Sequence, residues 1–246
     1  AREMKVVTQM GNQGSSGDGV RQMMEWFDGG AIGKVKEVYV WTNRPVWPQG
    51  IAYPAAGSPA PAELDWDLWL GPAKYREYNP ALLPFKWRGW WNFGTGALGD
   101  IGCHTIDSPF RILGLGYPTE VECSVGQVFI KDWTPEFIPE GCPPSSLVEI
   151  KFPATKKNKT PMKMVWMDGG LRPFHPDQLP ANEPLSTDGN GANGVYLHGS
   201  KGLMVIDMYG NNPRIYLNNG EKIKDPAPNT NAVKLPEFEH QISWTQ

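Results

Sequence analysis

The sequence predicts an α+β fold, built from an open and mainly antiparallel β-sheet with helices packed on one face. Three observations carry this prediction. Apolar residues recur at helical spacing over residues 17–28, and a second helical stretch follows Gly99. Candidate strands then follow one another through the second half of the chain, and Gly, Asn and Pro turns separate them. Strands joined in sequence by short turns are expected to pair antiparallel, with the helices covering one face.

The helices and strands can be assigned in order. Residues 17–28 have the spacing of an amphipathic helix, and Gly29 and Gly30 supply its stop. Val35–Trp41 is β-branched and aromatic and is expected to be a strand. A second helix is expected from Gly99 through Leu113. The further predicted strands are Thr119–Ile130, Ser146–Phe152, Met162–Met167, Gly194–His198, Gly202–Asp207 and Arg214–Leu217.

Residues 44–84 form a long Pro- and Trp-rich connection with one short amphipathic turn, DWDLWL. Seven of the eleven tryptophans lie between Trp41 and Trp91, which argues against disorder. An ordered aromatic loop suits the wall of a ligand site. It suits equally well a small apolar core beneath a long loop.

The two ends indicate a piece of a longer protein. Residues 5–10, KVVTQM, have the pattern of a buried strand with no preceding start signal. Residues 236–246, PEFEHQISWTQ, have the pattern of the first turns of a helix with no stop signal.

Composition excludes several classes of function. The net charge of −3 and the pI near 5.9 predict no nucleic-acid partner and no binding to anionic membranes. The chain contains no run of about 18 apolar residues, the length that a membrane span needs. The three cysteines have no metal-type spacing, so we expect no metal site, and their odd number argues against a disulfide framework.

The most informative stretch is WRGWWNFGTGALGDIGCHTIDSPF, residues 87–110. Asp100, His104 and Asp107 stand four and three residues apart, so a helix would project all three from one face. A histidine beside carboxylates can be held in one tautomer and tuned toward neutral pH, which suits proton transfer. The alternative is a partly buried helix in which Asp100 is the N-cap and His104 is simply hydrogen-bonded.

Gly94, Gly96 and Gly99 also spell G-x-G-x-x-G before that helix, with Glu120 about twenty residues on, as in a dinucleotide fingerprint. We reject that interpretation because the preceding residues, FKWRGWWNF, are not a buried β-branched strand. Asp100 would also place a carboxylate where the pyrophosphate should bind. The glycines more simply allow tight turns and close backbone approach.

The order of these features resembles one known family. A strand, MGNQ, a helix, GGAIGKVKEV, WTNRP, a Trp-rich loop and GALGDIGCHTIDSPF follow one another along the chain. This order is similar to the Gfo/Idh/MocA family of nicotinamide-dependent sugar oxidoreductases, and most similar to the branch carrying TNRPVWPQG and FKWRGWW. The densest shared motif is G-x-x-x-D-x-x-x-H-x-x-D from Gly96. Members pair an N-terminal Rossmann domain with a C-terminal, mainly antiparallel sheet domain.

The resemblance implies a domain division. Residues 1–14 would be the last strand of a missing dinucleotide-binding domain. Residues 15–246 would be the α+β domain that binds substrate and mediates oligomerisation.

The resemblance also implies roles for particular residues. His104 would exchange a proton with the substrate hydroxyl as hydride moves to or from the cofactor. Asp100 would orient the substrate or the imidazole, and Asp107 would anchor them from behind. Asn12 and Gln13 would line the nicotinamide side.

Substrate contacts are implied mainly in the aromatic loop, where Arg44 is a candidate for a polar contact. Basic residues beside aromatic ones often only stack or extend along them, so the others are weaker candidates. The full set of candidate substrate contacts is Arg44, Trp47, Gln49, Lys86, Arg88, Trp90 and Arg172.

The implied function is oxidation or reduction of a sugar or polyol hydroxyl, with NAD or NADP bound mainly by the missing N-terminal domain. The family's Gly-rich nucleotide loop and its catalytic lysine, in a Glu-Lys-Pro motif, do not occur here. Lys163 and Lys201 have the wrong neighbours. The 246 residues alone are therefore expected to be inactive and not to bind NAD(H) measurably.

Two alternatives remain open. One is an NAD-dependent glycoside hydrolase of the same superfamily, in which transient oxidation at C3 labilises the glycosidic bond and the cofactor is recycled. The other is a non-catalytic carbohydrate-binding domain, which intact Asp100 and His104 disfavour. The aromatic loop suits a carbohydrate ring in each case.

An open sheet with one uncovered face should expose apolar area, and such patches usually mark an interface. We therefore expect a homo-oligomer formed through the sheet face. The compartment is undetermined between bacterial-type cytoplasm and periplasm, because the true N-terminus is not seen.

Overall fold

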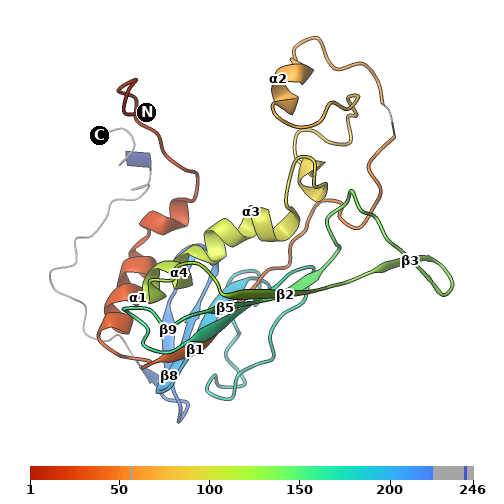
Figure 1. The fold of residues 1–246 in the computed structure, drawn as a ribbon. Helices are drawn as coiled ribbons and strands as arrows, with labels where there is room; N and C mark the ends of the chain where they lie inside the picture. Colours follow the sequence, from red (N-terminus) through yellow and green to blue (C-terminus); the bar gives the residue numbers. More distant parts are fainter. Residues whose placement is uncertain (56, 224–240, 243–246) are drawn as a thin grey trace.

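An eight-stranded open sheet organises the protein, and the computed structural model describes residues 1–55, 57–223 and 241–242 (Figure 1). The strand order is β10-β9-β8-β7-β1-β6-β5-β2. In this sheet β1 and β6 pair parallel and the other described pairs are antiparallel, which confirms the predicted fold class. The strands are β1 (Val35–Trp41), β2 (Glu120–Val125), β5 (Ser146–Phe152), β6 (Met162–Met167), β7 (Gly194–Gly199), β8 (Gly202–Ile206), β9 (Arg214–Leu217) and β10 (Lys222–Ile223).

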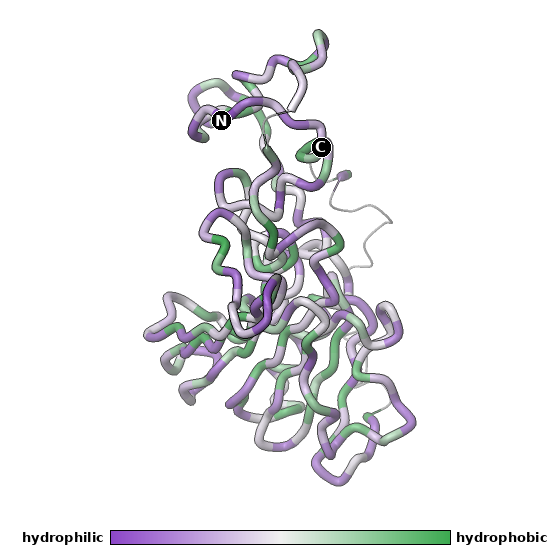
Figure 2. The backbone as a smooth tube through the Cα atoms, turned by 90° about the vertical axis from the view of Figure 1, so that its right-hand side faces the viewer, coloured by the Kyte–Doolittle hydropathy of each residue, from purple (hydrophilic) through white to green (hydrophobic). Residues whose placement is uncertain are grey.

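The helices α1 (Asp18–Asp28), α3 (Gly96–Thr105) and α4 (Asp107–Leu113) cover one face of this sheet (Figure 1). The main core lies between them and the sheet, where Val20 and Met23 of α1 meet Val38, Met164 and Leu197 of the strands. Apolar stretches of backbone run through the strands, and hydrophilic residues gather in the loops at the strand ends (Figure 2). The core therefore fixes α3 and α4 on the sheet.

Two predicted elements are divided in the structure. The strand expected over residues 119–130 becomes β2 and β3 (Val128–Lys131), and β3 pairs with β4 (Thr134–Glu136) in a separate arm that extends past the sheet edge (Figure 1). The helix expected through Leu113 is divided between α3 and α4 at Ile106. Pro109 has no N–H to donate to the carbonyl of Thr105, which explains a break at this point.

The prediction that residues 5–10, KVVTQM, form a buried strand is wrong. Residues 5–10 form no strand, and Val6, Val7 and Met10 are 55, 69 and 72 % exposed. A strand needs a neighbouring strand to satisfy its backbone groups, and none pairs with this segment among the described residues. The assignment of residues 1–14 to another domain stays a prediction. Most of the helix expected at residues 236–246 lies outside the described residues.

The second sheet face differs from the expected apolar surface. Leu179 and Leu185 cover part of it by packing on Trp41, Leu203 and Tyr216. Next to this cover the face is charged: Lys163 Nζ lies 3.2 Å from Glu37 Oε1 and 3.8 Å from Glu149 Oε2, and Lys151 pairs with Glu120 at 3.0 Å. The expectation of a mainly apolar open face is therefore wrong, because an ion-pair ladder crosses β1, β6, β5 and β2.

The aromatic loop forms a core of its own above the sheet. α2 (Trp66–Leu70) begins at Asp65, whose side chain caps the amide of Leu68. Trp66, Leu70, Leu82 and Trp90 are buried together there. Most of the described loop tryptophans thus support the loop, as one of the two interpretations of the sequence required. None of the described helices is long and apolar enough to cross a membrane.

Candidate active site

The candidate site lies along α3, whose start is fixed by tight packing at Gly96. This glycine has φ +62°, and a Cβ at its position would lie 3.0 Å from both Cys142 Cβ and Gln49 Oε1. At Gly94 a Cβ would lie 2.7 Å from the backbone of Arg88. The glycines before Asp100 therefore serve turns and close backbone approach, as the sequence indicated.

Asp100 is the fifth residue of α3 and caps nothing, so the N-cap alternative is wrong. Its Oδ1 accepts a hydrogen bond from Arg88 Nε at 2.7 Å, and both side chains are about a quarter exposed. The Arg88 guanidinium also lies 4.5 Å from the ring centres of Phe85 and Trp87 and donates to the Phe85 carbonyl. Arg88 is thereby fixed, and it holds the Asp100 carboxylate in one orientation.

His104 follows one turn later on the same face and is half-buried. Burial lowers the pKa of its imidazole, and the nearby charges of Asp100 and Asp107 oppose that shift only in part. The ring is therefore neutral at neutral pH, the form that can accept a proton. Its Nδ1 is buried and has no hydrogen-bond partner among the described residues.

Asp107, the first residue of α4, presents a second buried polar atom of this kind. Its Oδ2 has no hydrogen-bond partner in the described part of the chain, and Arg111 Nη1 lies 3.9 Å away, too far for a hydrogen bond. Buried polar groups are nearly always paired in folded proteins. Within the described residues, an imidazole nitrogen near the end of α3 and a carboxylate oxygen at the start of α4 are thus both left without a partner, which suits a bound polar group.

Tyr209 is the residue of this site that sequence reasoning missed. Its ring stands edge-on to His104, with 5.0 Å between ring centres. Burial raises the pKa of its hydroxyl. The charge of Arg44 lowers this pKa, and the charges of Asp188 and Asp100 raise it further. The only local signal was the turn-forming run of residues 210–213, which does not indicate what the preceding side chain faces.

The backbone around Tyr209 is held in an unusual conformation. Tyr209 has φ +64° within the short helix η3 (Met208–Gly210). Asp207, just before it, accepts from the amides of Thr187 and Gly210, through its side chain and its carbonyl respectively. A Cβ on Gly14 would lie 2.7 Å from the Tyr209 carbonyl oxygen, so the backbone at residue 14 packs directly on this turn. Strained backbone that surrounding contacts fix in this way is common at functional sites.

Two predicted groups are brought to the same place. Asn12 and Gln13 stand at the start of η1 (Gln13–Ser16), which contacts both α3 and η3. Arg111 holds this segment by donating to the Ser15 carbonyl at 2.7 Å. Arg44 is half-buried and close enough to affect the Tyr209 hydroxyl.

The remaining predicted substrate contacts are supports or lie elsewhere. Trp47 is 5 % exposed and donates through Nε1 to Gln49 Oε1, and Gln49 Nε2 donates to the Pro143 carbonyl. Trp90, 2 % exposed, belongs to the core of the aromatic loop. Lys86 is exposed on the helix η2 (Lys86–Gly89). Arg172 lines a separate hollow on the 170–191 segment.

A hollow of about 310 Å³, here called the α3 groove, gives a ligand access to this helix. Asp100 and the ion-paired Arg88 line it together with the rings of Trp87, Trp91 and Phe93. A flat sugar face packs well against such rings, while its hydroxyls need polar partners of this kind. The lining residues are Trp87, Arg88, Trp91, Asn92, Phe93, Gly94, Thr95, Gly96, Gly99 and Asp100.

A comparison with known protein families finds a match, and it includes the candidate site on α3. Residues 35–128 match the family described as "Oxidoreductase family, C-terminal alpha/beta domain". The matched stretch includes β1, the aromatic loop, α3 and α4. The resemblance to the Gfo/Idh/MocA family is thereby confirmed for these residues. No curated protein matches the chain.

Solved structures are similar at low identity. A Gal80p super-repressor mutant from Saccharomyces cerevisiae is 15 % identical with a TM-score of 0.49, and the alignment covers 99 % of this chain and 53 % of that one. An NAD binding oxidoreductase from Klebsiella pneumoniae is 16 % identical with a TM-score of 0.48, and the alignment covers 90 % of this chain and 46 % of that one. An aldose-aldose oxidoreductase from Caulobacter crescentus, complexed with glycerol, is 14 % identical with a TM-score of 0.48, and the alignment covers 99 % of this chain and 53 % of that one. The chain thus spans about half the length of these proteins.

Proposed function

From the identification of residues 35–128 as the C-terminal alpha/beta domain of this oxidoreductase family, we propose that the chain supplies the substrate side of an NAD(P)-dependent oxidoreductase acting on a sugar or polyol hydroxyl. One observation carries the proposal. Among the described residues, the buried Nδ1 of the neutral His104 imidazole has no hydrogen-bond partner, and His104 stands one helical turn from the Arg88–Asp100 pair of the α3 groove.

The chemistry follows from these groups. Oxidation of a hydroxyl-bearing carbon to a carbonyl releases one hydride and one proton. In this proposal His104 takes the proton from the hydroxyl, and the carboxylates of Asp100 and Asp107 stabilise the imidazolium that forms. Tyr209 holds the imidazole ring in place through its edge-on packing. In the reverse reaction His104 returns the proton to the carbonyl oxygen.

The nicotinamide nucleotide, when bound, accepts or donates the hydride. The described residues fit only the nicotinamide end of such a group. Gln13 is exposed and Asn12 half-exposed, and their segment packs on the Tyr209 turn. These two residues would contact the nicotinamide, and the phosphates would be held outside this chain.

A second candidate, NAD-dependent glycoside hydrolysis, is favoured by one feature. An apolar cavity adjoins the α3 groove and shares lining residues with it. A free sugar has no group that needs an apolar cavity, whereas a glycoside can carry one. Product analysis separates the two candidates, since a dehydrogenase yields reduced nucleotide and a hydrolase yields a released aglycone with no net reduction.

The test of the proposed function uses the full-length protein with NAD⁺ and NADP⁺ and a panel of sugars, polyols and glycosides. We expect oxidation of at least one of them, and loss of that activity in His104→Ala. His198→Ala is the matched control, because His198 lies on β7 against Glu37 and away from α3. Binding of carbohydrate without turnover on any substrate, by a folded wild-type protein, would instead support the non-catalytic alternative.

We also propose that copies of the protein associate through the sheet face. The ladder of Glu37, Lys163 and Glu149 alternates in sign, so two copies related by a two-fold axis can place opposite charges against each other. The attraction in such an interface is mainly electrostatic and weakens with salt.

A further inference from the structure

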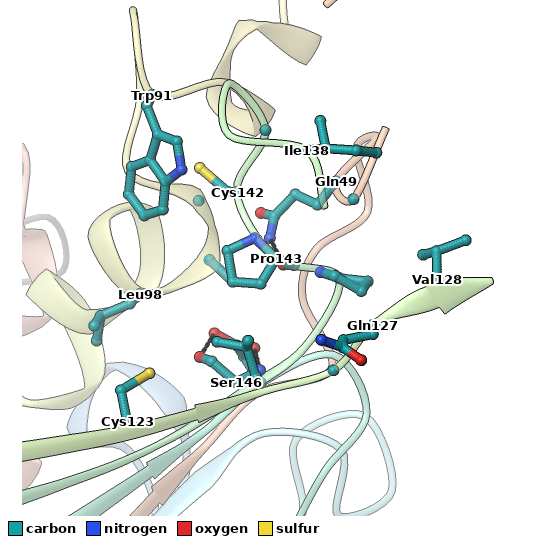
Figure 3. Close-up of a pocket in the computed structure, with 18 of the residues that line it drawn as sticks. Gln49, Trp91, Leu98, Cys123, Gln127, Val128, Ile138, Cys142, Pro143 and Ser146 are labelled. Atoms are coloured by element: carbon teal, nitrogen blue, oxygen red, sulfur yellow. Dashed lines mark hydrogen bonds between the residues drawn. The ribbon is translucent and has the colours of Figure 1, made fainter. Parts of the chain in front are cut away.

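A second and larger hollow lies under the first turns of α3. It has a volume of about 590 Å³, and the edge strand β2, the β3–β4 arm and the segment 137–146 enclose it (Figure 3). Leu98 from α3 and Cys123 from β2 face the same space in this view. We call it the arm cavity. Its apolar walls are formed chiefly by Leu98, Val125, Val128, Ile138, Pro143 and Val148.

Two polar side chains of the arm cavity, Gln49 and Asp168, are already paired, while Gln127 and Glu136 line it on the side of the arm. Gln49 is engaged by Trp47 and Pro143, as described above. Asp168 accepts from the Ser146 amide at 2.5 Å, from Ser146 Oγ at 2.8 Å and from Trp166 Nε1 at 2.8 Å. A ligand in this cavity therefore gains little from Gln49 and Asp168 and is stabilised mainly by apolar contact.

The two cysteines of the lining, Cys123 and Cys142, do not change this character, because burial raises the pKa of both thiols. Cys142 is 1 % exposed, and burial raises the pKa of its thiol to about 12. It stays a neutral, weakly polar group at physiological pH.

The arm cavity and the α3 groove are neighbours. Four residues line both: Trp91, Thr95, Gly96 and Gly99. Trp91 is 51 % exposed and stands beside α3 (Figure 3), so its indole can contact a ligand that extends from one hollow into the other. The combined site is polar at Asp100 and Arg88 and apolar under Leu98. At about 590 Å³ the cavity alone falls within the range of roughly 300–1,000 Å³ typical of small-molecule sites.

We propose that the arm cavity binds an apolar aryl or alkyl substituent of the substrate, so that the substrate is a glycoside whose sugar occupies the α3 groove and whose aglycone occupies the cavity. This inference rests on the proposed function for the sugar, but the cavity's preference for an apolar group can be tested without turnover. The polarity of the two hollows sets the orientation of such a molecule. In the reversed orientation the sugar hydroxyls would be buried against apolar walls without hydrogen-bond partners.

The first experiment measures binding of N-phenyl-1-naphthylamine, a neutral apolar fluorophore, to the full-length protein. Val125→Trp is the test variant, because Val125 lines the cavity and is 52 % exposed at the end of β2, where a larger side chain can fill the space without entering the main core. Val121→Trp is the matched control on the same strand, 58 % exposed and outside the cavity lining. We expect saturable binding to wild type and Val121→Trp, and at least about tenfold weaker binding to Val125→Trp.

The second experiment compares kcat/KM for phenyl and methyl glycosides of the same sugars. We expect a preference for the phenyl compound of about 10- to 200-fold in wild type and Val121→Trp, falling toward one in Val125→Trp. Fluorophore binding without oxidation of any carbohydrate would leave the apolar site standing and remove the proposed function. Oxidation with equal kcat/KM for both glycosides would keep the proposed function and remove the assignment of the cavity to the aglycone.

Two further results would overturn the cavity assignment. One is fluorophore binding that Val125→Trp does not weaken. The other is a pair of results: fluorophore binding to wild type is lost as the protein concentration rises, and Val125→Trp converts an oligomer to monomers. Together they would show that a second copy of the chain, and not a substrate group, occupies the cavity.

Discussion

The ring of Tyr209 lies edge-on against the imidazole of His104, with 5.0 Å between the ring centres and 70° between the ring planes. These residues are 105 positions apart in the sequence, and they meet because the Tyr209 turn is fixed against η1 and α3. The contact covers one side of His104, while the charges of Asp100 on α3 and Asp107 at the start of α4 act on its imidazole.

His104→Ala should lower kcat in the full-length enzyme by about 10²- to 10⁴-fold, because it removes the proton acceptor. The melting midpoint should change little. Single-turnover hydride transfer and thermal unfolding, measured together, check this expectation against His198→Ala. Normal turnover per folded molecule, with a loss of about 1–3 kcal/mol in stability, would assign His104 a purely structural role.

Asp107→Asn should reduce kcat less, by about 10- to 100-fold, because Asp107 supports the imidazole from behind. The substitution keeps the size of the side chain and removes the charge that stabilises the protonated ring. The pH profile gives the decisive readout, since the kinetic pKa assigned to His104 should fall further in this variant. An unchanged profile would mean that Asp107 does not act through His104.

His104 should also make stability depend on pH in a defined direction. Burial lowers its pKa, so between its ordinary value near 6.5 and the lower folded value the unfolded chain binds more protons than the folded one. The free energy of unfolding should therefore fall as the pH drops through this window and level off below it. The quantity to measure is the difference between wild type and His104→Ala in urea unfolding from pH 7 to pH 4. A difference that stays constant, or that favours wild type increasingly at low pH, contradicts the neutral buried imidazole.

Tyr209→Phe should keep the ring contact with His104 and lose only the hydroxyl. If the hydroxyl contacts the substrate, kcat/KM should fall about three- to tenfold, the size of one hydrogen bond, with an unchanged melting midpoint. Tyr209→Gly relieves the positive φ but removes the ring, so it should alter the kinetic pKa of His104 as well. Equal kinetics for wild type and both variants would exclude Tyr209 from the site.

Association through the sheet face should depend on salt. Light scattering at low ionic strength should show an oligomer at tens of micromolar protein that dissociates in about 1 M salt, where charges are screened over about 3 Å. Lys163→Glu should dissociate it at low salt, because it places three like charges side by side. A monomer under all conditions rules out this interface.

Much of the fold could be predicted because its signals are local. The spacing of apolar residues located α1, the alternation and turn residues located β1, β5, β6, β7, β8 and β9, and the order of those strands indicated a mainly antiparallel sheet. The triplet of Asp100, His104 and Asp107 was equally local, since helical geometry alone places such residues on one face. The sequence could not show that KVVTQM pairs with no described strand, because pairing depends on a partner elsewhere.

Only the tertiary structure determined the contacts between segments that are distant in the sequence. No pattern in the sequence brings Tyr209 to His104, pairs Arg88 with Asp100, or buries Trp90 in the core of the aromatic loop. The arm cavity likewise exists only because β2, α3 and the segment 137–146 meet around Cys142. Local propensity and spacing reach a few residues along the chain, whereas packing joins side chains more than a hundred residues apart. The residue types available to the site were therefore determined by sequence, and their partners, burial and charge environment by the fold.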